Sequence, residues 1–248
     1  MKKLSFLSIG FYFLLIVLYS CSNSSQKVNE SELDNNSEVS TKDETLSSNE
    51  FVDSRDDNVY KTVKIGSQTW MAENLKYLPS VVGAGTGSET TPYYYVYGYE
   101  GINVNDAKAT TNYQTYGVLY NWSAAKQACP TGWHLPSDAE WTELTDYLGG
   151  EDLAGGKLKA TGTIEAGTGL WYEPNTDASN ETGFTALPGG YRYDYGIFDT
   201  FGYGGDWWSS SEYDSVDAWH RGMYYGNSGV SRSSDIKELG FSVRCVRD

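Results

Sequence analysis

An aromatic segment in the last quarter of the chain carries the side chains best suited to hold a ligand. Residues 191–199 read Tyr-Arg-Tyr-Asp-Tyr-Gly-Ile-Phe-Asp, and Phe201-Gly202-Tyr203 follows closely. Aromatic faces stack on the C–H faces of sugars, interleaved Asp and Arg side chains hydrogen-bond hydroxyl groups, and glycines permit tight turns. The residues predicted to bind a ligand are Tyr193, Asp194, Tyr195, Phe198 and Tyr203. The alternative is that these rings only cover a fold with little regular secondary structure.

The sequence has no set of residues typical of catalysis. Its only histidines, His134 and His220, are too few for a histidine-rich zinc site. Acidic pairs such as Asp194 and Asp199 could flank a glycosidic bond, but acidic loop residues at this density are usually solvated. We therefore expect a protein that is not an enzyme and that needs no cofactor.

The N-terminal segment predicts export and lipid anchoring. Residues 1–20 combine a positive start with a short apolar run, which is typical of a signal peptide rather than a membrane span. Leu18-Tyr19-Ser20-Cys21 resembles the bacterial lipobox, so Cys21 is expected to be acylated and held in the lipid bilayer. Ser22 rather than Asp follows, which favours the outer membrane. The alternative is a simple secretory signal with an incidental cysteine.

Residues 21–58 are predicted to be a lipidated N-terminus followed by a disordered acidic tether. From residue 22 to residue 58, ten acidic side chains occur against three basic ones. A segment of low hydrophobicity and high charge cannot offset the entropy lost on ordering. We expect it to lift the following domain off the membrane.

Residues 59–248 are predicted to be one domain, which holds 31 of the 37 aromatic residues. The whole chain has a formal charge of −15 and no block of Lys or Arg. Nucleic-acid affinity comes mainly from neutralised phosphates, so no nucleic-acid partner is expected. A hydrophobic content of 39% excludes global disorder.

Several regular elements can be predicted within this domain. Val59–Gly66 alternates as a strand does, and Gln68–Met71 returns as a hairpin. Asn121 can cap a helix that extends to Cys129. Ser137 and Glu140 form a capping box for a second helix, which Gly149-Gly150 ends. The alternating residues 241–247 predict a terminal strand.

Two cysteines remain if Cys21 is acylated. Cys129 and Cys245 lie 116 positions apart in a chain expected to be exported, where disulfides persist. A disulfide closing such a loop would add about 4–5 kcal/mol on the chain-entropy account. The alternative is two buried free thiols.

Seven stretches of the domain resemble the Fibrobacter succinogenes major paralogous domain, found in secreted proteins and lipoproteins. The stretches are residues 63–75, 116–122, 129–137, 140–141, 183–192, 207–211 and 240–246. That family is similar to the C-type-lectin-like and formylglycine-generating-enzyme superfamily. The resemblance implies an α+β fold with two helices, a small twisted antiparallel sheet and long loop-rich aromatic and glycine insertions. It also implies the Cys129–Cys245 disulfide, but no established activity.

The superfamily resemblance raises two further site hypotheses. Calcium-dependent lectins use a triplet like Glu173-Pro174-Asn175, in which Glu and Asn oxygens bind metal and sugar together. Here Trp208 is followed by two serines rather than the Asn-Asp pair that completes the set, so we interpret the triplet as a turn and keep calcium as an alternative. Formylglycine-generating enzymes need a cysteine pair near the C-terminus, where this chain has only Cys245.

The sequence therefore predicts a noncatalytic, envelope-anchored lipoprotein that displays a lectin-like binding or adhesion domain. Its expected partners are the lipid bilayer, through Cys21, and a glycan or cell-surface polymer. One alternative is a structural or assembly protein of the envelope that binds another protein. An oxidase or hydrolase is the third hypothesis.

Overall fold

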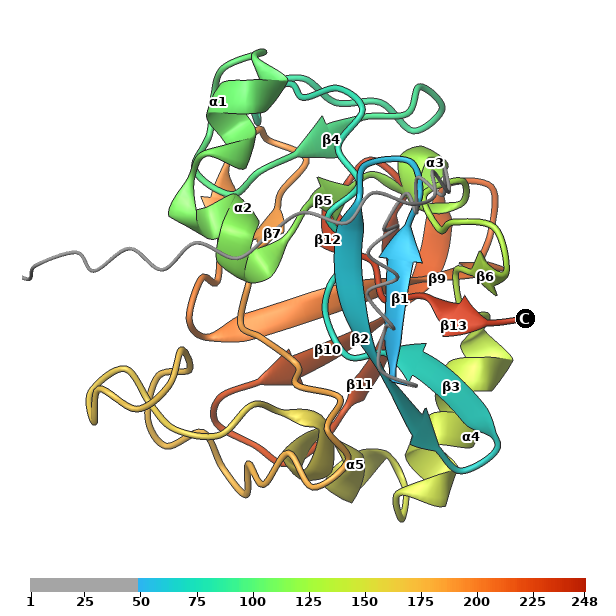
Figure 1. Ribbon diagram of the computed structural model, residues 1–248, viewed down its shortest axis with the longest axis vertical. Coiled ribbons are helices and arrows are strands. Elements are labelled where there is room, and N and C mark those ends of the chain that lie inside the picture. The colour runs from blue at the N-terminus through green and yellow to red at the C-terminus, as the bar shows by residue number, and fades with distance from the viewer. Residues whose placement is uncertain (1–48) are drawn as a thin grey trace, which may run out of the picture. The chain divides into compact units, whose positions relative to one another are not determined.

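β-Strands supply most of the regular structure in residues 49–248, the part of the chain that the computed structural model describes (Figure 1). Thirteen strands form sheets of five, six and two strands. The predicted signal peptide, Cys21 and most of the predicted tether lie outside the described residues.

The five-stranded sheet contains the predicted opening hairpin. Strand β2 (Asn58–Ile65) pairs antiparallel with β3 (Gln68–Met71), and Gly66 makes the turn with φ of +59°. Glycine adopts this backbone conformation without steric cost. The sheet order is β1 (Glu50–Asp53), β2, β3, β13 (Val246–Arg247) and β6 (Trp133–His134).

The six-stranded sheet is built around three long strands, β9 (Gly204–Glu212), β10 (Asp217–Tyr224) and β11 (Ser231–Ile236). The order continues from β9 through the two-residue strands β12 (Phe241–Ser242), β5 (Leu119–Tyr120) and β4 (Tyr94–Tyr95). All pairs are antiparallel except β12 with β9. The third sheet is a small hairpin of β7 (Tyr191–Arg192) and β8 (Phe198–Asp199).

Five helices accompany the sheets in the described residues. They are α1 (Val104–Lys108), α2 (Thr111–Tyr116), α3 (Trp122–Ala125), α4 (Asp138–Tyr147) and α5 (Glu151–Leu158). The capping-box helix is confirmed as α4, and the Asn121 side chain caps α3, which ends at Ala125 instead of Cys129. Within residues 49–248, no helix has the length and apolar character needed to span a bilayer.

The expected fold class is wrong. An α+β, C-type-lectin-like fold with two helices and a small twisted sheet was predicted, whereas the structure is mostly β, with thirteen strands in three sheets and helices of four to ten residues. Helix caps leave strong local signals in a sequence. Two-residue strands such as β5 and β12 depend on pairing with distant segments and leave no alternating pattern.

The described residues begin within residues 21–58, the range predicted to be the lipidated N-terminus and tether. Strand β1 lies inside the predicted tether and pairs with β2, so that Phe51 faces Tyr60 across the ladder. The Phe51 ring packs on Trp133 at 5.3 Å between centroids, and the buried Asp53 pairs with Arg55 at 2.6 Å. The acidic composition of the surrounding segment concealed a short strand that the sheet stabilises.

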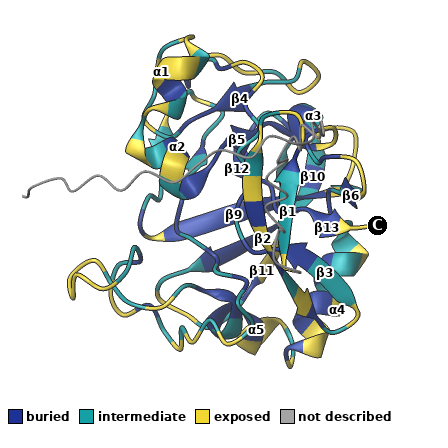
Figure 2. Ribbon diagram, in the orientation of Figure 1, coloured by how far each residue is buried: buried dark blue, intermediate teal, exposed yellow. Residues whose placement is uncertain are grey.

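Many aromatic residues of the domain lie in two buried clusters. Strand β9, which contributes to both clusters, is buried over most of its length (Figure 2). One cluster, on the side of α3, includes Trp122, Trp208 and Phe241, and the other includes Trp70 and Trp207. Adjacent residues of β9 point to opposite faces of the sheet, so Trp207 and Trp208 enter different clusters. Much of the high aromatic content is therefore core, which burial stabilises by about 2 kcal/mol or more for each large side chain.

Candidate functional site

The tyrosine hairpin, which we define as residues 191–199, projects from the six-stranded sheet. Tyr191 pairs with Asp199, and the Tyr193 amide donates to the Ile197 carbonyl at 2.7 Å. Gly196 closes the turn with φ of +78°. The base of the hairpin is joined to the sheet region by a bridge between Arg192 and Gly240. The hairpin is thus a short, backbone-paired support for its tip.

Three tyrosines extend from the core to the tip of this hairpin. The Tyr191 ring lies 5.9 Å from the buried Phe241 ring, Tyr193 lies 5.9 Å from Tyr191, and Tyr195 lies 5.2 Å from Tyr193. Tyr195 is 81% exposed. Asp194 uses one carboxylate oxygen to accept the Tyr195 amide at 2.9 Å, which orders the turn. Aromatic pairs at these separations hold each ring in place.

The structure brings together only part of the predicted ligand-binding set. Tyr193, Asp194 and Tyr195 share the hairpin tip. Phe198 packs on Tyr97 at 4.9 Å and so supports the hairpin from below. Tyr203 is stacked on Tyr172 at 4.3 Å, in a separate aromatic group.

Arg192 was expected to hydrogen-bond a ligand, but it is buried. Its guanidinium donates to the Ala84 and Glu238 carbonyls at 2.8 and 2.9 Å, and it lies over the Tyr95 ring. The side chain points inward because strand alternation puts it opposite Tyr191 and Tyr193. Its function is to fasten the hairpin to the domain.

A group of charged residues lies on the six-stranded sheet near the hairpin, and we call it the carboxylate–imidazole cluster: the buried Asp206 and His220 and the half-exposed Asp235. Asp206 of β9 faces Gly222 of β10, and Asp235 of β11 faces Ala218. Because side chains alternate along strands, these residues share one face of the sheet. His220 Nδ1 lies 3.5 Å from Asp206 Oδ1, and Nε2 lies 3.1 Å from Asp235 Oδ2.

His220 is protonated at neutral pH in this arrangement. It is only 4% exposed, and its ring lies 4.7 Å from the Phe241 ring. Burial alone would lower the pKa of His220, but the carboxylates of Asp206 and Asp235 outweigh burial and raise it to about 9. The ring nitrogens are within ion-pair distance of both carboxylates without hydrogen-bond geometry, so the pairing is mainly electrostatic.

Two tyrosine side chains lie beside the cluster. Tyr224 donates to Asp206 Oδ1 at 3.4 Å. Burial, together with the charges of Asp199, Asp206 and Asp235, raises the pKa of Tyr191 to about 12. Tyr191 and His220 both pack on the Phe241 ring, at 5.9 and 4.7 Å between centroids, so Tyr191 lies beside the cluster. Both hydroxyls stay protonated and can donate hydrogen bonds.

This surface presents aromatic faces beside hydrogen-bonding groups. Tyr193 and Tyr195 offer ring faces, while Asp235, Tyr191 and Tyr224 offer hydrogen-bond acceptors and donors. The carboxylates of Asp206 and Asp235 favour the protonated form of His220, which raises its pKa.

The Glu173-Pro174-Asn175 triplet does not form a joint site. The Asn175 side chain is buried and donates to the Ala160 and Gly162 carbonyls, both at 3.0 Å. Glu173 is exposed, and Thr163 donates to it at 3.4 Å. In residues 49–248 no group of three or more His, Cys, Asp or Glu side chains is arranged to hold a metal ion.

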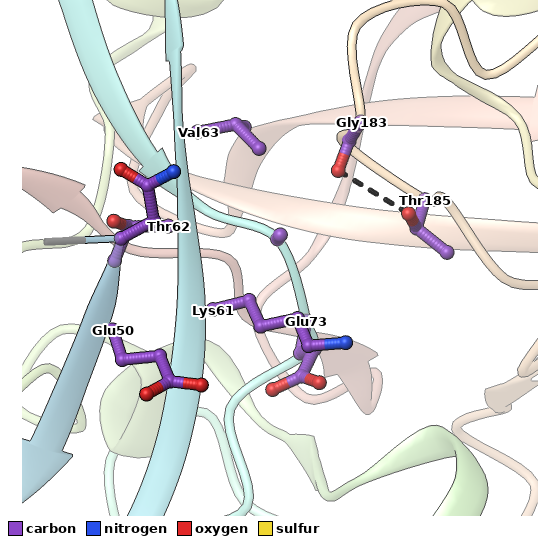
Figure 3. Close-up of a pocket in the computed structure, with 9 residues that line it drawn as sticks. Glu50, Lys61, Thr62, Val63, Glu73, Gly183 and Thr185 are labelled. Carbon is purple, nitrogen blue, oxygen red and sulfur yellow. Dashed lines mark hydrogen bonds between the residues drawn. The ribbon is translucent and has the colours of Figure 1, made fainter. Parts of the chain in front are cut away.

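A hollow of about 330 Å³ lies between β2 and residues 183–185 (Figure 3). Glu50, Lys61 and Glu73 line it together with Val63 and Thr185. It offers charges of both signs but no aromatic face. It therefore lacks the stacking surface that the tyrosine hairpin has.

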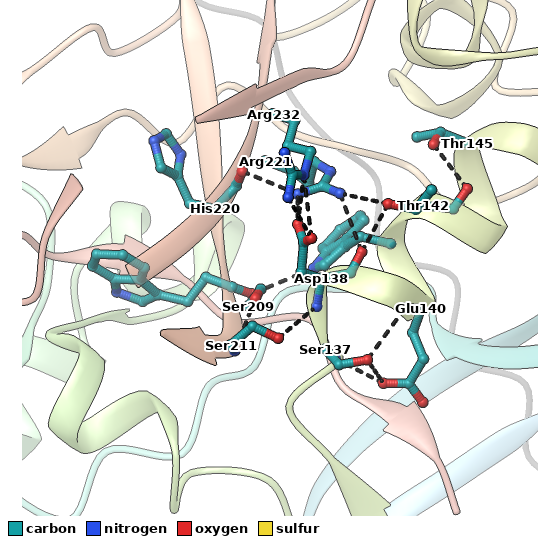
Figure 4. Close-up of polar contacts among 12 residues, drawn as sticks. Ser137, Asp138, Glu140, Thr142, Thr145, Ser209, Ser211, His220, Arg221 and Arg232 are labelled. Carbon is teal, nitrogen blue, oxygen red and sulfur yellow. Dashed lines mark hydrogen bonds and ion pairs between the residues drawn. The ribbon is translucent and has the colours of Figure 1, made fainter. Parts of the chain in front are cut away.

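Polar groups around the start of α4 serve the fold. Asp138 accepts from Arg221 of β10 at 2.7 Å and from Arg232 of β11 at 2.8 Å (Figure 4). Arg221 also donates to the Thr142 hydroxyl at 3.1 Å. These contacts fasten the helix to the sheet, on the face opposite to His220, because neighbouring strand residues point in opposite directions.

His134 is also occupied by structural contacts. Its ring nitrogens lie 2.7 Å from Glu140 Oε1 and 2.6 Å from Asp248 Oδ1. Burial opposes protonation, but the two carboxylates outweigh it and raise the pKa of His134. Glu140 belongs to the capping box of α4, so His134 ties the C-terminal strand to that helix.

Cys129 and Cys245 are joined by a disulfide with their Cα atoms 5.9 Å apart. Cys129 follows α3, and Cys245 lies between β12 and β13, where the chain leaves one sheet for the other. Cys21 lies outside the described residues.

Sequence reasoning missed the cluster. The sequence excluded His220 from a histidine-rich zinc site but did not predict its burial, and Asp206 and Asp235 were not singled out. A usable signal exists in residues 217–224, where alternation puts His220 on the same face as Ala218 and Tyr224. The pairing of β10 with its neighbours, which supplies both carboxylates, leaves no local pattern.

Comparison with known families gives one match. A family model described as the Fibrobacter succinogenes major domain matches residues 63–247, a range that includes the tyrosine hairpin, the cluster and the disulfide. The resemblance found in the sequence is confirmed at the level of this family, whose description names no catalytic role. No curated protein and no solved structure matches the chain.

Proposed function

The chain belongs to the Fibrobacter succinogenes major domain family, and we propose that it is a noncatalytic binding protein of the cell envelope. Its tyrosine hairpin holds a glycan or another cell-surface polymer. The observation that carries this proposal is the exposed Tyr195 ring, supported by contacts through Tyr193 and Tyr191 to the buried Phe241.

A supported aromatic ring suits the binding of sugars. The ring presents a flat apolar face, and the neighbouring hydroxyl and carboxylate groups meet the polar edge of a sugar. Because Tyr193 and Tyr195 are already in contact with each other, little side-chain entropy remains to be lost when a ligand binds. An exposed tyrosine pair on a paired hairpin is thus well suited to this task.

The glycan proposal is tested by replacing the two tip rings together. Tyr193→Ala with Tyr195→Ala should reduce affinity for a glycan found by array or pull-down by about tenfold or more, since each tenfold step is about 1.4 kcal/mol. Tyr147→Ala is the matched control, because that ring is also exposed but lies at the end of α4. Unchanged affinity in the double variant would exclude the hairpin as the binding site.

A cross-linking experiment addresses the alternative of an assembly protein. Cross-linking in intact cells that recovers one stoichiometric protein partner, without glycan binding, would favour that function over the proposed one.

The proposed anchor is the acylated Cys21. Several acyl chains, each contributing about 0.8 kcal/mol per buried methylene, hold a protein stably on a bilayer. Cys21→Ala should therefore move the protein from the membrane fraction to the soluble fraction, as measured by fractionation and immunoblotting. Ser22→Ala serves as the control that keeps the anchor. Equal membrane retention of both variants would refute acylation at Cys21.

A further inference from the structure

We infer that the binding surface continues from the tyrosine hairpin onto the carboxylate–imidazole cluster, which selects neutral or amino saccharides over acidic ones. This inference rests on the proposed glycan-binding function and adds the chemical class of the ligand. Three features of Asp206, His220 and Asp235 support it: their polar atoms without hydrogen-bond partners, the exposure of Asp235 and their charges.

The cluster contains polar atoms without hydrogen-bond partners. Six buried side-chain nitrogen or oxygen atoms in residues 49–248 have none, and three of them belong to Asp206 and His220. Buried polar groups are normally satisfied, and those that are not mark strain or a functional site. Asp206 Oδ2 is a buried acceptor without a donor, and the acceptor of the cluster that a ligand can reach is the Asp235 carboxylate.

The cluster is reached from the surface at one side. The Asp235 side chain is 47% exposed, and Ser231 and Ser233 of the same edge strand are exposed. A hollow of about 360 Å³ lies at the opposite end of β11 from Asp235 and is lined by Tyr224 and Ser231. Its other lining groups include the carboxylates of Glu151 and Asp152. A ligand lying along β11 would thus meet Asp235 first.

The hairpin and the cluster form one surface. Tyr191 contacts Tyr193 on the hairpin, and it packs on Phe241, the ring that also contacts His220. Tyr224 is bound to Asp206 on the other side. A saccharide stacked on Tyr193 and Tyr195 can therefore extend past Tyr191 to the Asp235 carboxylate.

The charge of this surface is negative. Three carboxylates occur on it, Asp194, Asp199 and Asp235, and Asp206 is buried beneath them. The one cation of the cluster is His220, which is buried between Asp206 and Asp235. Arg192, the other nearby cation, is buried and turned away toward Glu238. Juxtaposed like charges disfavour binding, so a uronic acid is excluded, whereas hydroxyl and ammonium groups find acceptors.

The test compares three saccharides of matched length with the full-length protein: a neutral β-glucan, chitosan and polygalacturonate. Wild type should bind the neutral or the amino polymer about tenfold or more tightly than polygalacturonate, and added salt should reduce the difference. Asp235→Asn should reduce the ratio of these two affinities about threefold or more. Asp146→Asn, the same change on exposed α4, should leave it unaltered.

The outcomes separate the inference from the proposed function. If no saccharide binds, the proposed function fails and the inference with it. If polygalacturonate binds as well as the neutral polymer, or if Asp235→Asn behaves like Asp146→Asn, the inference fails while the proposed function stands. Should Asp235→Asn not fold, Asp199→Asn gives the same charge change at an exposed hairpin position and should act in the same direction.

Discussion

At the scale of single residues, His220 shows how a strand position sets the charge of a side chain. The ring is buried against Phe241 and lies between Asp206 and Asp235. The two carboxylates overcome the effect of burial on its pKa, so it is a permanent cation at neutral pH. A buried cation held by two anions stabilises the fold and gives the adjoining surface a defined charge.

We expect the contribution of His220 to stability to depend on pH. Its pKa is about 9 in the folded protein, above the ordinary value of 6.5, so protonation favours the folded state. The contribution is fully present below pH 6.5 and is lost as pH rises through 9, and it amounts to about 3 kcal/mol. Urea unfolding of wild type and His220→Gln at about pH 6 and about pH 9.5 measures this change.

His134→Gln is the matched control for this experiment. His134 also lies between two carboxylates, but its side chain is 40% exposed, so solvent screens the pairs. The free energy of unfolding of His134→Gln, relative to wild type, should therefore change less between the two pH values than that of His220→Gln. If wild type and His220→Gln differed in free energy of unfolding by the same amount at both pH values, this result would contradict a charged His220 in the cluster.

At the scale of elements, the strongest local signal belongs to α4. The Ser137 hydroxyl accepts the Glu140 amide at 3.2 Å, and Glu140 accepts the Ser137 amide at 2.7 Å. The cap starts a helix whose Trp141 and Leu144 enter the core between the sheets. Asp138, one position inside the helix, then pairs with the arginines of β10 and β11.

Removing the cap should destabilise the domain modestly. Ser137→Ala leaves a helix amide without its acceptor, and such changes cost about 1 kcal/mol. Chemical denaturation of the variant measures the loss. Ser210→Ala, an exposed strand position, is the control and should stay within about 0.5 kcal/mol of wild type. Equal stability of the two variants would show that tertiary contacts alone hold α4.

Some elements could be predicted from the sequence because their causes are local. The hairpin of β2 and β3 follows from alternation and the Gly66 turn, and α4 follows from its cap. The strands β4, β5 and β12 have two residues each and exist because distant segments pair there. The fold class was misjudged because local helix signals were visible and these pairings were not.

The candidate site likewise has one part that could be predicted from local sequence and one part that could not. Tyr193, Asp194 and Tyr195 are neighbours in sequence, so the hairpin tip that they share was predictable. The cluster joins three strands, with Asp206 and Asp235 at sequence positions 14 and 15 residues from His220 in opposite directions. Only the register of β10 against β9 and β11 brings these side chains together. No pattern within a single strand encodes that register.

At the scale of the whole molecule, the segment 241–247 holds the two large sheets together. It contributes β12 to the six-stranded sheet and β13 to the five-stranded one. Between them, the fully buried Arg244 donates to Asn74 Oδ1 at 2.8 Å and to the Met71 carbonyl at 3.3 Å. Asn74 also accepts from Trp207 at 2.9 Å, so one polar network links both sheets. Burial lowers the pKa of Arg244 to about 9.

The Cys129–Cys245 disulfide acts on this same crossing segment. Its loop spans 116 residues, including β9, β10, β11 and the tyrosine hairpin. Closing a loop of this length restricts the unfolded chain, which corresponds to about 4–5 kcal/mol on the chain-entropy account. We expect the free energy of unfolding of the wild type to fall by several kcal/mol, up to about that amount, when reductant is added during chemical denaturation. A variant with Cys129→Ala and Cys245→Ala controls for direct effects of the reductant and should unfold identically with and without it. Wild-type stability that does not respond to complete reduction would mean that the Arg244 network and the strand pairings hold the crossing segment without help from the disulfide.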